Sequence, residues 1–123
     1  MIISLKRFKS QKSKYSMGGQ KIDTLVDFPL EGLNMAPFVL SQQQKSQPLI
    51  YDLFAVSNHY GGVGGGHYTA FGKNSLSGQW YSFNDSSCQP TSQSKIVSES
   101  AYNLFYRQRG HCDLANIDFD VFH

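Results

Sequence analysis

The chain has 123 residues, enough for one domain with a buried core of its own. Apolar residues make up 40% of the sequence and charged residues 16%, which excludes a disordered chain. The formal net charge is +2 and the basic residues form no stripe, so we expect no nucleic-acid partner. No apolar run approaches the length of a membrane span, and we expect no membrane partner either.

The two cysteines, Cys88 and Cys112, lie far apart and match no CxxC spacing. They predict neither a disulfide framework nor a zinc site, and no other metal or cofactor is expected. This cysteine usage fits a reducing compartment. We therefore expect an intracellular protein of the cytoplasm or the nucleus.

The first expected strand covers residues 2–8, IISLKRF, and begins one residue after Met1. Natural domains rarely begin inside a strand, so we expect the chain to be a fragment of a longer protein. In this strand one residue of the pair Lys6-Arg7 should face solvent. Residues 9–20 are polar with a Gly-Gly pair and predict a loop or a hairpin turn.

The middle of the chain predicts one weak strand and one strong strand. Leu25, Val26 and Phe28 suggest a short strand that ends at Pro29. Residues 41–48 are polar and form a connector. Residues 51–60, YDLFAVSNHY, predict a strand with apolar residues on both faces, which favours a central position in a sheet.

Two further strands are expected near 67–73 and 79–84, joined by the turn NSLSG. A helical turn then precedes a last strand at 101–108, and the tail after Gly110 has no clear period and should be frayed. These elements predict an antiparallel, strand-rich α+β unit with little helix. Aromatic candidates for the core are Trp80, Phe83, Tyr102, Phe105 and Tyr106.

His67 opens one strand of the expected hairpin, and Asn84 and Asp85 close the other. A hairpin centred on Leu76 places Asp85 opposite His67, and a register one residue different places Asn84 there instead. Residues opposite each other on antiparallel strands have Cβ atoms about 4.5–5.5 Å apart. Either register therefore predicts a hydrogen bond between the imidazole and an amide or carboxylate.

Such a pair suits proton transfer. An oxygen that accepts the Nδ1–H of the imidazole fixes its tautomer and leaves Nε2 to take a proton from a nucleophile. The glycines before His67 expose it and let a substrate backbone come close. An isolated histidine is more often structural, but the ordered Gly–His–strand–turn–strand–Asn–Asp arrangement favours catalysis. His59, which precedes the glycine loop, is expected to help hold that loop.

These segments resemble the C-terminal part of the catalytic domain of the ubiquitin-specific proteases, papain-like cysteine peptidases that cleave ubiquitin from proteins. GGGHYTAFGKN resembles the family's histidine box, and WYSFNDSS resembles the motif that carries the third member of its catalytic triad. SLKRF, KIDTLVDFPLEGL, YDLFAVSNHYGG and AYNLFYRQR are similar to other family segments in the same order. The resemblance implies that residues 1–110 form the palm-like antiparallel sheet of an incomplete catalytic domain whose helical half is missing, and that 111–123 form a tail.

The resemblance also implies roles for individual residues. His67 is the general base and later the general acid, Asn84 orients its imidazole, and Asp85 is a helper that positions water or the oxyanion side. A ubiquitin-facing loop is implied around residues 17–26. The implied substrate-binding residues, which shape the channel for the Gly-Gly tail of ubiquitin, are Gly64, Gly65, Gly66 and Tyr68.

One member of the family's apparatus is missing from the sequence. The family nucleophile lies in a Gly-Asn-Thr-Cys-type motif at the start of a helix, and nothing here matches it; Cys88 is better interpreted as a structural thiol. The resemblance thus implies thiol-dependent hydrolysis of the (iso)peptide bond at the ubiquitin C-terminus, with this chain inactive alone. The implied partners are ubiquitin, ubiquitinated proteins and the missing N-terminal half of the catalytic domain. The alternative is a non-catalytic ubiquitin-binding module or a pseudoenzyme fragment.

Overall fold

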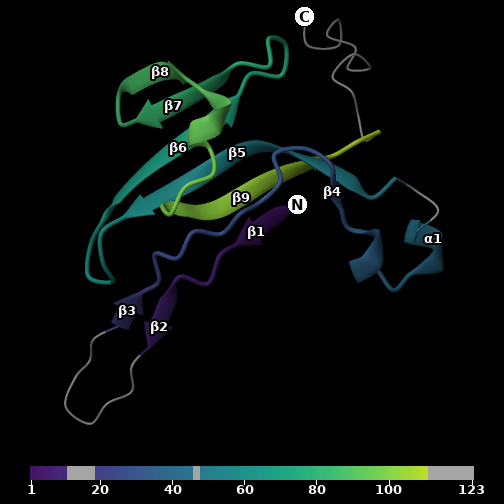
Figure 1. Cartoon of the computed structure of the whole chain (residues 1–123), viewed down its shortest axis with the longest axis horizontal. Helices are drawn as coiled ribbons and strands as arrows, with labels where there is room; N and C mark the ends of the chain where they lie inside the picture. The colour runs from purple at the N-terminus through teal and green to yellow at the C-terminus, as the bar shows by residue number, and fades with distance from the viewer. Residues whose placement is uncertain (11–18, 46–47, 111–123) are drawn as a thin grey trace, which may run out of the picture.

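The computed structural model describes residues 1–10, 19–45 and 48–110. Within these residues, seven strands form one antiparallel sheet in the order β1-β9-β5-β6-β7-β8, with β4 paired to β5 (Figure 1). These strands are β1 (Ile2–Ser4), β4 (Leu33–Asn34), β5 (Ile50–Tyr60), β6 (His67–Lys73), β7 (Trp80–Asn84), β8 (Ser87–Thr91) and β9 (Ala101–Gln108). The strand-rich antiparallel fold predicted from the sequence is confirmed.

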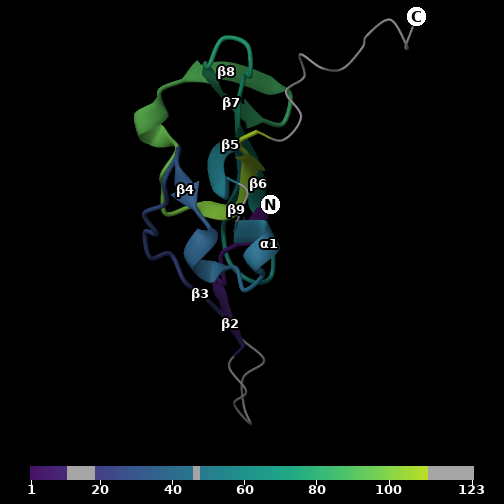
Figure 2. The same cartoon turned by 90° about the vertical axis from the view of Figure 1, so that its right-hand side faces the viewer.

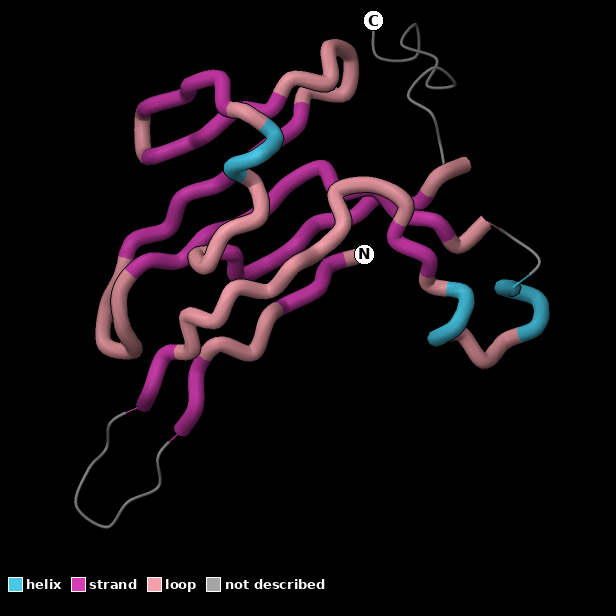
Figure 3. The backbone as a smooth tube through the Cα atoms, in the orientation of Figure 1, coloured by secondary structure: helices cyan, strands magenta, loops and turns pink. Residues whose placement is uncertain are grey.

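A smaller antiparallel ribbon of β2 (Phe8–Ser10) and β3 (Gly19–Lys21) extends away from the large sheet (Figure 2). The helical elements are short: η1 (Ala36–Phe38), α1 (Gln42–Lys45) and η2 (Gln93–Lys95) (Figure 3). The last of these confirms the helical turn predicted before β9. No helix in the described part of the chain is long and apolar enough to span a membrane.

β5 is the central strand, as its two apolar faces predict, and it pairs with β6 on one side and β9 on the other. Its register with β9 shifts between Leu53 and Ala55 and again between Ser57 and Asn58. The first shift interrupts the regular alternation of side chains along a strand. Because of it, Leu53 and Val56 both enter the core, where their exposed fractions are 2% and 1%.

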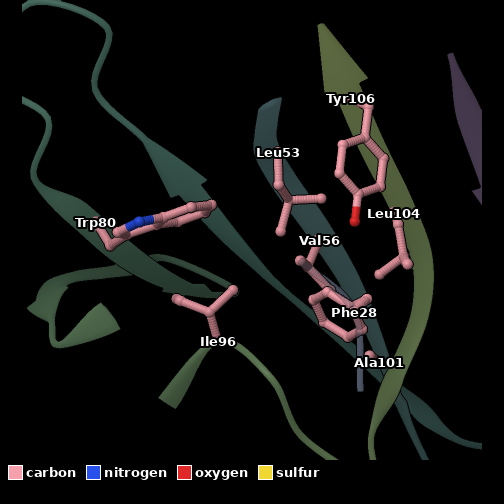
Figure 4. Packing of buried hydrophobic residues seen from close by; sticks show 8 residues of the cluster. All are labelled: Phe28, Leu53, Val56, Trp80, Ile96, Ala101, Leu104 and Tyr106. Atoms are coloured by element: carbon pink, nitrogen blue, oxygen red, sulfur yellow. The ribbon is translucent and has the colours of Figure 1, made fainter. Parts of the chain in front are cut away.

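The core lies on one face of the sheet and joins side chains from three strands to two covering loops (Figure 4). Its buried members are Phe28, Leu53, Val56, Trp80, Ile96, Ala101, Leu104 and Tyr106. Three hydrogen bonds join the covering segment before β4 to the sheet, one of them from the Gly32 amide to Asp52 Oδ1 at 2.9 Å. The Tyr106 hydroxyl donates to the Pro29 carbonyl at 2.7 Å, and the Leu53 amide donates to the Leu30 carbonyl at 2.8 Å. Each large side chain buried in this way stabilises the fold by about 1.5–3 kcal/mol.

Two strand predictions in the first third of the chain are wrong. Residues 2–8 do not form one strand, because Arg7 turns inward and is only 3% exposed, while Lys6 stays in solvent. The Arg7 guanidinium donates to the carbonyls of Ile22 and Thr24 and, from Nε, to the carbonyl of Ala101. The strand expected just before Pro29 is absent as well: this segment runs over the core without a partner strand among the described residues, Arg7 takes the carbonyls of Ile22 and Thr24 just before it, and the Pro29 carbonyl accepts from Tyr106.

The sequence also missed β8 and misplaced three core residues. β8 contains Pro90 and is exposed along most of its length, so no apolar alternation marks it as a strand. Phe83 is 43% exposed, and Tyr102 and Phe105 are half-buried and lie outside the core, whereas Trp80 and Tyr106 are buried as predicted. The polar connector contains α1, and the tail lies outside the described residues.

Candidate active site

His67 and Asn84 meet at one end of the sheet, where β6 begins and β7 ends. The imidazole Nε2 lies 2.7 Å from the amide Oδ1, and both residues are exposed. An amide oxygen can only accept, so Nε2 carries the hydrogen of this bond and Nδ1 keeps its lone pair. The predicted contact between the imidazole and a side-chain oxygen is observed, but Nε2 makes it rather than the predicted Nδ1.

The register of the β6–β7 hairpin differs by one residue from the prediction, and this explains the geometry of the pair. Lys73 lies opposite Trp80 rather than Gln79. Gln79 belongs to the turn, where its carbonyl accepts the Asn74 amide at 2.9 Å. Continued in this register, His67 is a diagonal neighbour of Asn84, and diagonal positions about 7–8 Å apart are within reach of long side chains.

Asp85 does not face His67, contrary to the count from Leu76. It occupies the turn between β7 and β8, with a φ of 49° in the left-handed region. Aspartate tolerates this conformation better than most residues, which accounts for its place in a tight turn. The structure shows no hydrogen bond between its carboxylate and His67. Its role as a helper remains a prediction.

The glycine loop before His67 rests on His59. A Cβ on Gly66 would come within 2.5 Å of the Tyr60 carbonyl oxygen and even closer to His59 Nε2, whereas Gly64 and Gly65 have nothing within 4 Å. The His59 ring is 95% buried and packs 4.9 Å from the Tyr68 ring. His59 therefore supports the loop, as expected. Its Nδ1 is nevertheless buried without a hydrogen-bond partner.

Two pockets flank this loop and meet at His59 and Gly62. The smaller has a volume of about 330 Å³ and the larger about 790 Å³. Residues around the smaller pocket are Phe8, His59, Gly62, Val63, Gly65, Gly66 and Tyr68. Three of the four predicted substrate-binding residues line it, and Gly64 lines neither pocket. Sequence reasoning missed Phe8, whose only signal was its place at the end of SLKRF.

Cys88 is exposed on β8 and lies opposite Phe83. Because side chains alternate along a strand, Cys88 is on the face of β7 and β8 opposite to Asn84, where it cannot serve the imidazole. Cys112 lies outside the described residues. In the described part of the chain, no group of three or more His, Cys, Asp and Glu side chains is placed to hold a metal ion.

An antiparallel sheet that brings a histidine and an asparagine together at its end, as here, matches the sheet portion of a papain-like cysteine peptidase. The sequence profile of the family described as "Ubiquitin carboxyl-terminal hydrolase" matches residues 1–106. The chain therefore belongs to this cysteine-type hydrolase family, as the sequence resemblance implied.

Individual relatives agree with this assignment. The chain is 50% identical over 109 residues to Ubiquitin carboxyl-terminal hydrolase 15 of Homo sapiens, covering 89% of this chain and 10% of that protein. It is 47% identical over the same length to Ubiquitin carboxyl-terminal hydrolase 4 of Pongo abelii, with 89% and 11% covered. The chain thus spans about a tenth of these relatives.

Among solved structures, the chain resembles one from the Ubp8-Sgf11-Sgf73-Sus1 SAGA DUB module, with a TM-score of 0.72, 38% identity, and 89% of this chain and 24% of that chain covered. A structure of the Ubp8/Sgf11/Sus1/Sgf73 DUB module bound to ubiquitin aldehyde gives a TM-score of 0.74 at 36% identity, with 88% and 24% covered.

Proposed function

We propose that this chain is the C-terminal part of a deubiquitinase catalytic domain and that it supplies the general base and its orienting residue. The observation that carries the proposal is the 2.7 Å contact between His67 Nε2 and Asn84 Oδ1, which leaves Nδ1 as the basic atom of the neutral ring. The nucleophile comes from a part of the protein outside this chain. The chain alone is therefore inactive.

In the proposed reaction, Nδ1 of His67 takes the proton of the cysteine thiol, and the thiolate attacks the carbonyl carbon of the last ubiquitin glycine. The imidazolium then gives this proton to the leaving amine as the acyl-enzyme forms. In the second half, Nδ1 takes a proton from the attacking water and returns it to the sulfur as the free carboxylate leaves. Throughout, Asn84 accepts the Nε2–H and so keeps the ring aligned.

The substrate assignment is supported by the shape of the site beside His67. The loop offers glycines instead of side chains next to two pockets, so an extended peptide without side chains can approach the imidazole. The aromatic residues Phe8 and Tyr68 line one pocket and would flank such a peptide. The names of the relatives and the ubiquitin-bound Ubp8 structures point to ubiquitin as its source. We further propose that the protein acts in the cytoplasm or the nucleus.

A chimaera tests this function. The chain replaces the matching 109-residue segment of human Ubiquitin carboxyl-terminal hydrolase 15, and hydrolysis of a fluorogenic ubiquitin amide is measured. We expect turnover by the chimaera, none by the chain alone, and a loss of at least about 10²-fold in the His67→Ala chimaera, because general acid–base help is typically worth about 10²–10⁴-fold. Cys88→Ala is the matched control and should keep the parent rate.

Turnover by the chain alone, or a His67→Ala chimaera as active as its parent, would contradict the proposal. A chimaera that binds ubiquitin without hydrolysing it would favour the binding-module alternative.

A further inference from the structure

A third pocket, of about 580 Å³, lies at the other end of the sheet from His67. It is formed by the start of β5, the β6–β7 turn and the end of β9, and its lining includes Lys73, the last residue of β6. His67 is the first residue of the same strand, so six steps of about 3.3 Å, roughly 20 Å, separate the two ends. This pocket is therefore not part of the candidate active site.

The pocket carries an excess of positive charge. Its charged lining residues are the cations Lys73, Arg107 and Arg109 and the single carboxylate of Asp52. Two 2.7 Å hydrogen bonds bind Arg109 to Asp52, and the Lys73 ammonium lies 3.6 Å from a carboxylate oxygen of Glu31, so the charges within each of these pairs offset each other. Arg107 is exposed and forms no ion pair within the described residues; its guanidinium lies 5.0 Å above the centre of the Phe54 ring.

Apolar surface lies beside these cations. Leu76, at the tip of the β6–β7 turn, also lines the pocket and is 96% exposed. The turn is not loose there, because Asn74 Oδ1 accepts the amides of Leu76 and Ser77 at 2.9 and 3.0 Å. The pocket thus offers a fixed pair of features, positive charge and apolar surface, and suits a segment that is both acidic and apolar.

The chain itself contains such a segment next to the pocket. Gly110 lines the pocket, and the 13 residues that follow it, HCDLANIDFDVFH, contain three aspartates and no lysine or arginine. In the stretch IDFDVF, acidic residues alternate with apolar ones. Thirteen residues reach at most about 45 Å, and a short tether of this kind gives an effective concentration of about millimolar. The family profile ends at residue 106, so this segment lies beyond the shared fold.

We propose that residues 111–123 bind in this pocket, with aspartates toward Arg107 and apolar side chains toward Phe54 and Leu76. The proposal is independent of the hydrolase function, because its pocket shares no residue with the candidate active site.

The test uses NMR spectra of the full chain. The Nε–Hε signal of Arg107 and the methyl signals of Leu76 are compared between the parent and the variant D113N/D118N/D120N. We expect both to shift, and we expect the parent Arg107 signal to move toward that of the variant when salt is raised to about 1 M, where the Debye length falls to about 3 Å. The matched control D23N/D27N/E99Q removes the same number of acidic charges outside the pocket lining and should leave both signals in place.

Unchanged Arg107 and Leu76 signals in D113N/D118N/D120N would overturn the proposal. So would an equal shift in the control variant, since that would show a general charge effect. If the tail variant is silent while an added poly-glutamate peptide shifts Arg107, the pocket serves an external acidic partner and the proposal is likewise wrong.

Discussion

Replacing Gly66 with alanine should distort the loop that delivers His67. The new Cβ would lie within 2.5 Å of the Tyr60 carbonyl oxygen, a separation that real Cβ atoms essentially never show. This oxygen belongs to the backbone of β5, opposite His67 in the sheet, so it cannot rotate away as a side chain could. To relieve both contacts, β6 must move off β5 at its first residue and the buried His59 ring must shift as well.

The magnitude follows from two opposing effects. Adding a methyl group to a packed site costs about 1–3 kcal/mol. Replacing glycine by alanine at a compatible position stabilises by about 0.4–1 kcal/mol, because the unfolded chain loses freedom. We therefore expect Gly66→Ala to lower the free energy of unfolding by roughly 0–2.6 kcal/mol overall. Gly64→Ala and Gly65→Ala, which meet nothing within 4 Å and lack the left-handed φ of Gly61, should be neutral or slightly stabilising.

Urea unfolding of the three variants measures this difference directly, because they share one chemical change in one loop. The ¹⁵N shifts of the His67 imidazole provide a second measurement, and only Gly66→Ala should alter the Nε2–H signal that Asn84 stabilises. If Gly66→Ala unfolds at the same urea concentration as Gly65→Ala and leaves the imidazole shifts unchanged, the inferred packing of the loop on His59 is wrong.

Three further outcomes are expected. Asn84→Ala removes the acceptor of the Nε2–H bond, which is worth about 0.5–1.5 kcal/mol, so ¹⁵N shifts should show less of the Nε2–H tautomer of His67. Asn84→Asp keeps an acceptor and should retain this tautomer. Equal spectra for the two variants would refute the role of Asn84. Burial raises the pKa of Tyr106 from 10.0 to about 12, so the contribution of its neutral hydroxyl to the free energy of unfolding should be fully present below pH 10 and fall as the pH rises toward 12. A Tyr106→Phe variant that loses just as much stability over this range would be contrary evidence. The hydrogen bonds from Arg109 lower the pKa of Asp52 below 3.8, although partial burial opposes them. The pair should therefore stabilise the fold above pH 3.8 and lose this effect as the pH falls through the lowered pKa. Urea unfolding should find Asp52→Asn less stable than the parent near neutral pH and no different from it in strong acid.

The sequence predicted the strands that carry their own apolar pattern. β5, β6, β7 and β9 were all located, because aromatic and β-branched residues mark them. β8 was missed because it is exposed and contains Pro90. It lies at the edge of the described sheet, where it is paired with β7. The strand expected near Leu25 has no partner strand in the described structure; the contacts of this region are instead with distant side chains, Arg7 at the carbonyls of Ile22 and Thr24 and Tyr106 at the carbonyl of Pro29. Periodicity within a short window contains no information of this kind.

In the candidate site, too, contacts between residues close in the sequence could be predicted and contacts between distant residues could not. His67 and Asn84 belong to one hairpin, so their contact could be predicted from local spacing, although a longer turn shifted the register and the count for Asp85 failed. Phe8 and His59 lie 51 positions apart in the chain, yet their rings meet edge to face at 5.5 Å. No local pattern brings them together. The ring nitrogen that faces Asn84 likewise depends on a side-chain orientation that residue order does not determine.

The place of β9 in the sheet sets a limit on how this protein can form during synthesis. β9 lies between β1 and β5, so the first strand has no partner until the last one has been made. The hydrogen bond from the Arg7 guanidinium to the Ala101 carbonyl, 94 positions later in the chain, likewise forms only once β9 has been made. At about 5–20 residues per second, the ribosome holds the amino-terminal strand unpaired for several seconds. A nascent chain that stalls before residue 101 leaves that strand open to chaperones, and the sheet closes only once the final strand emerges.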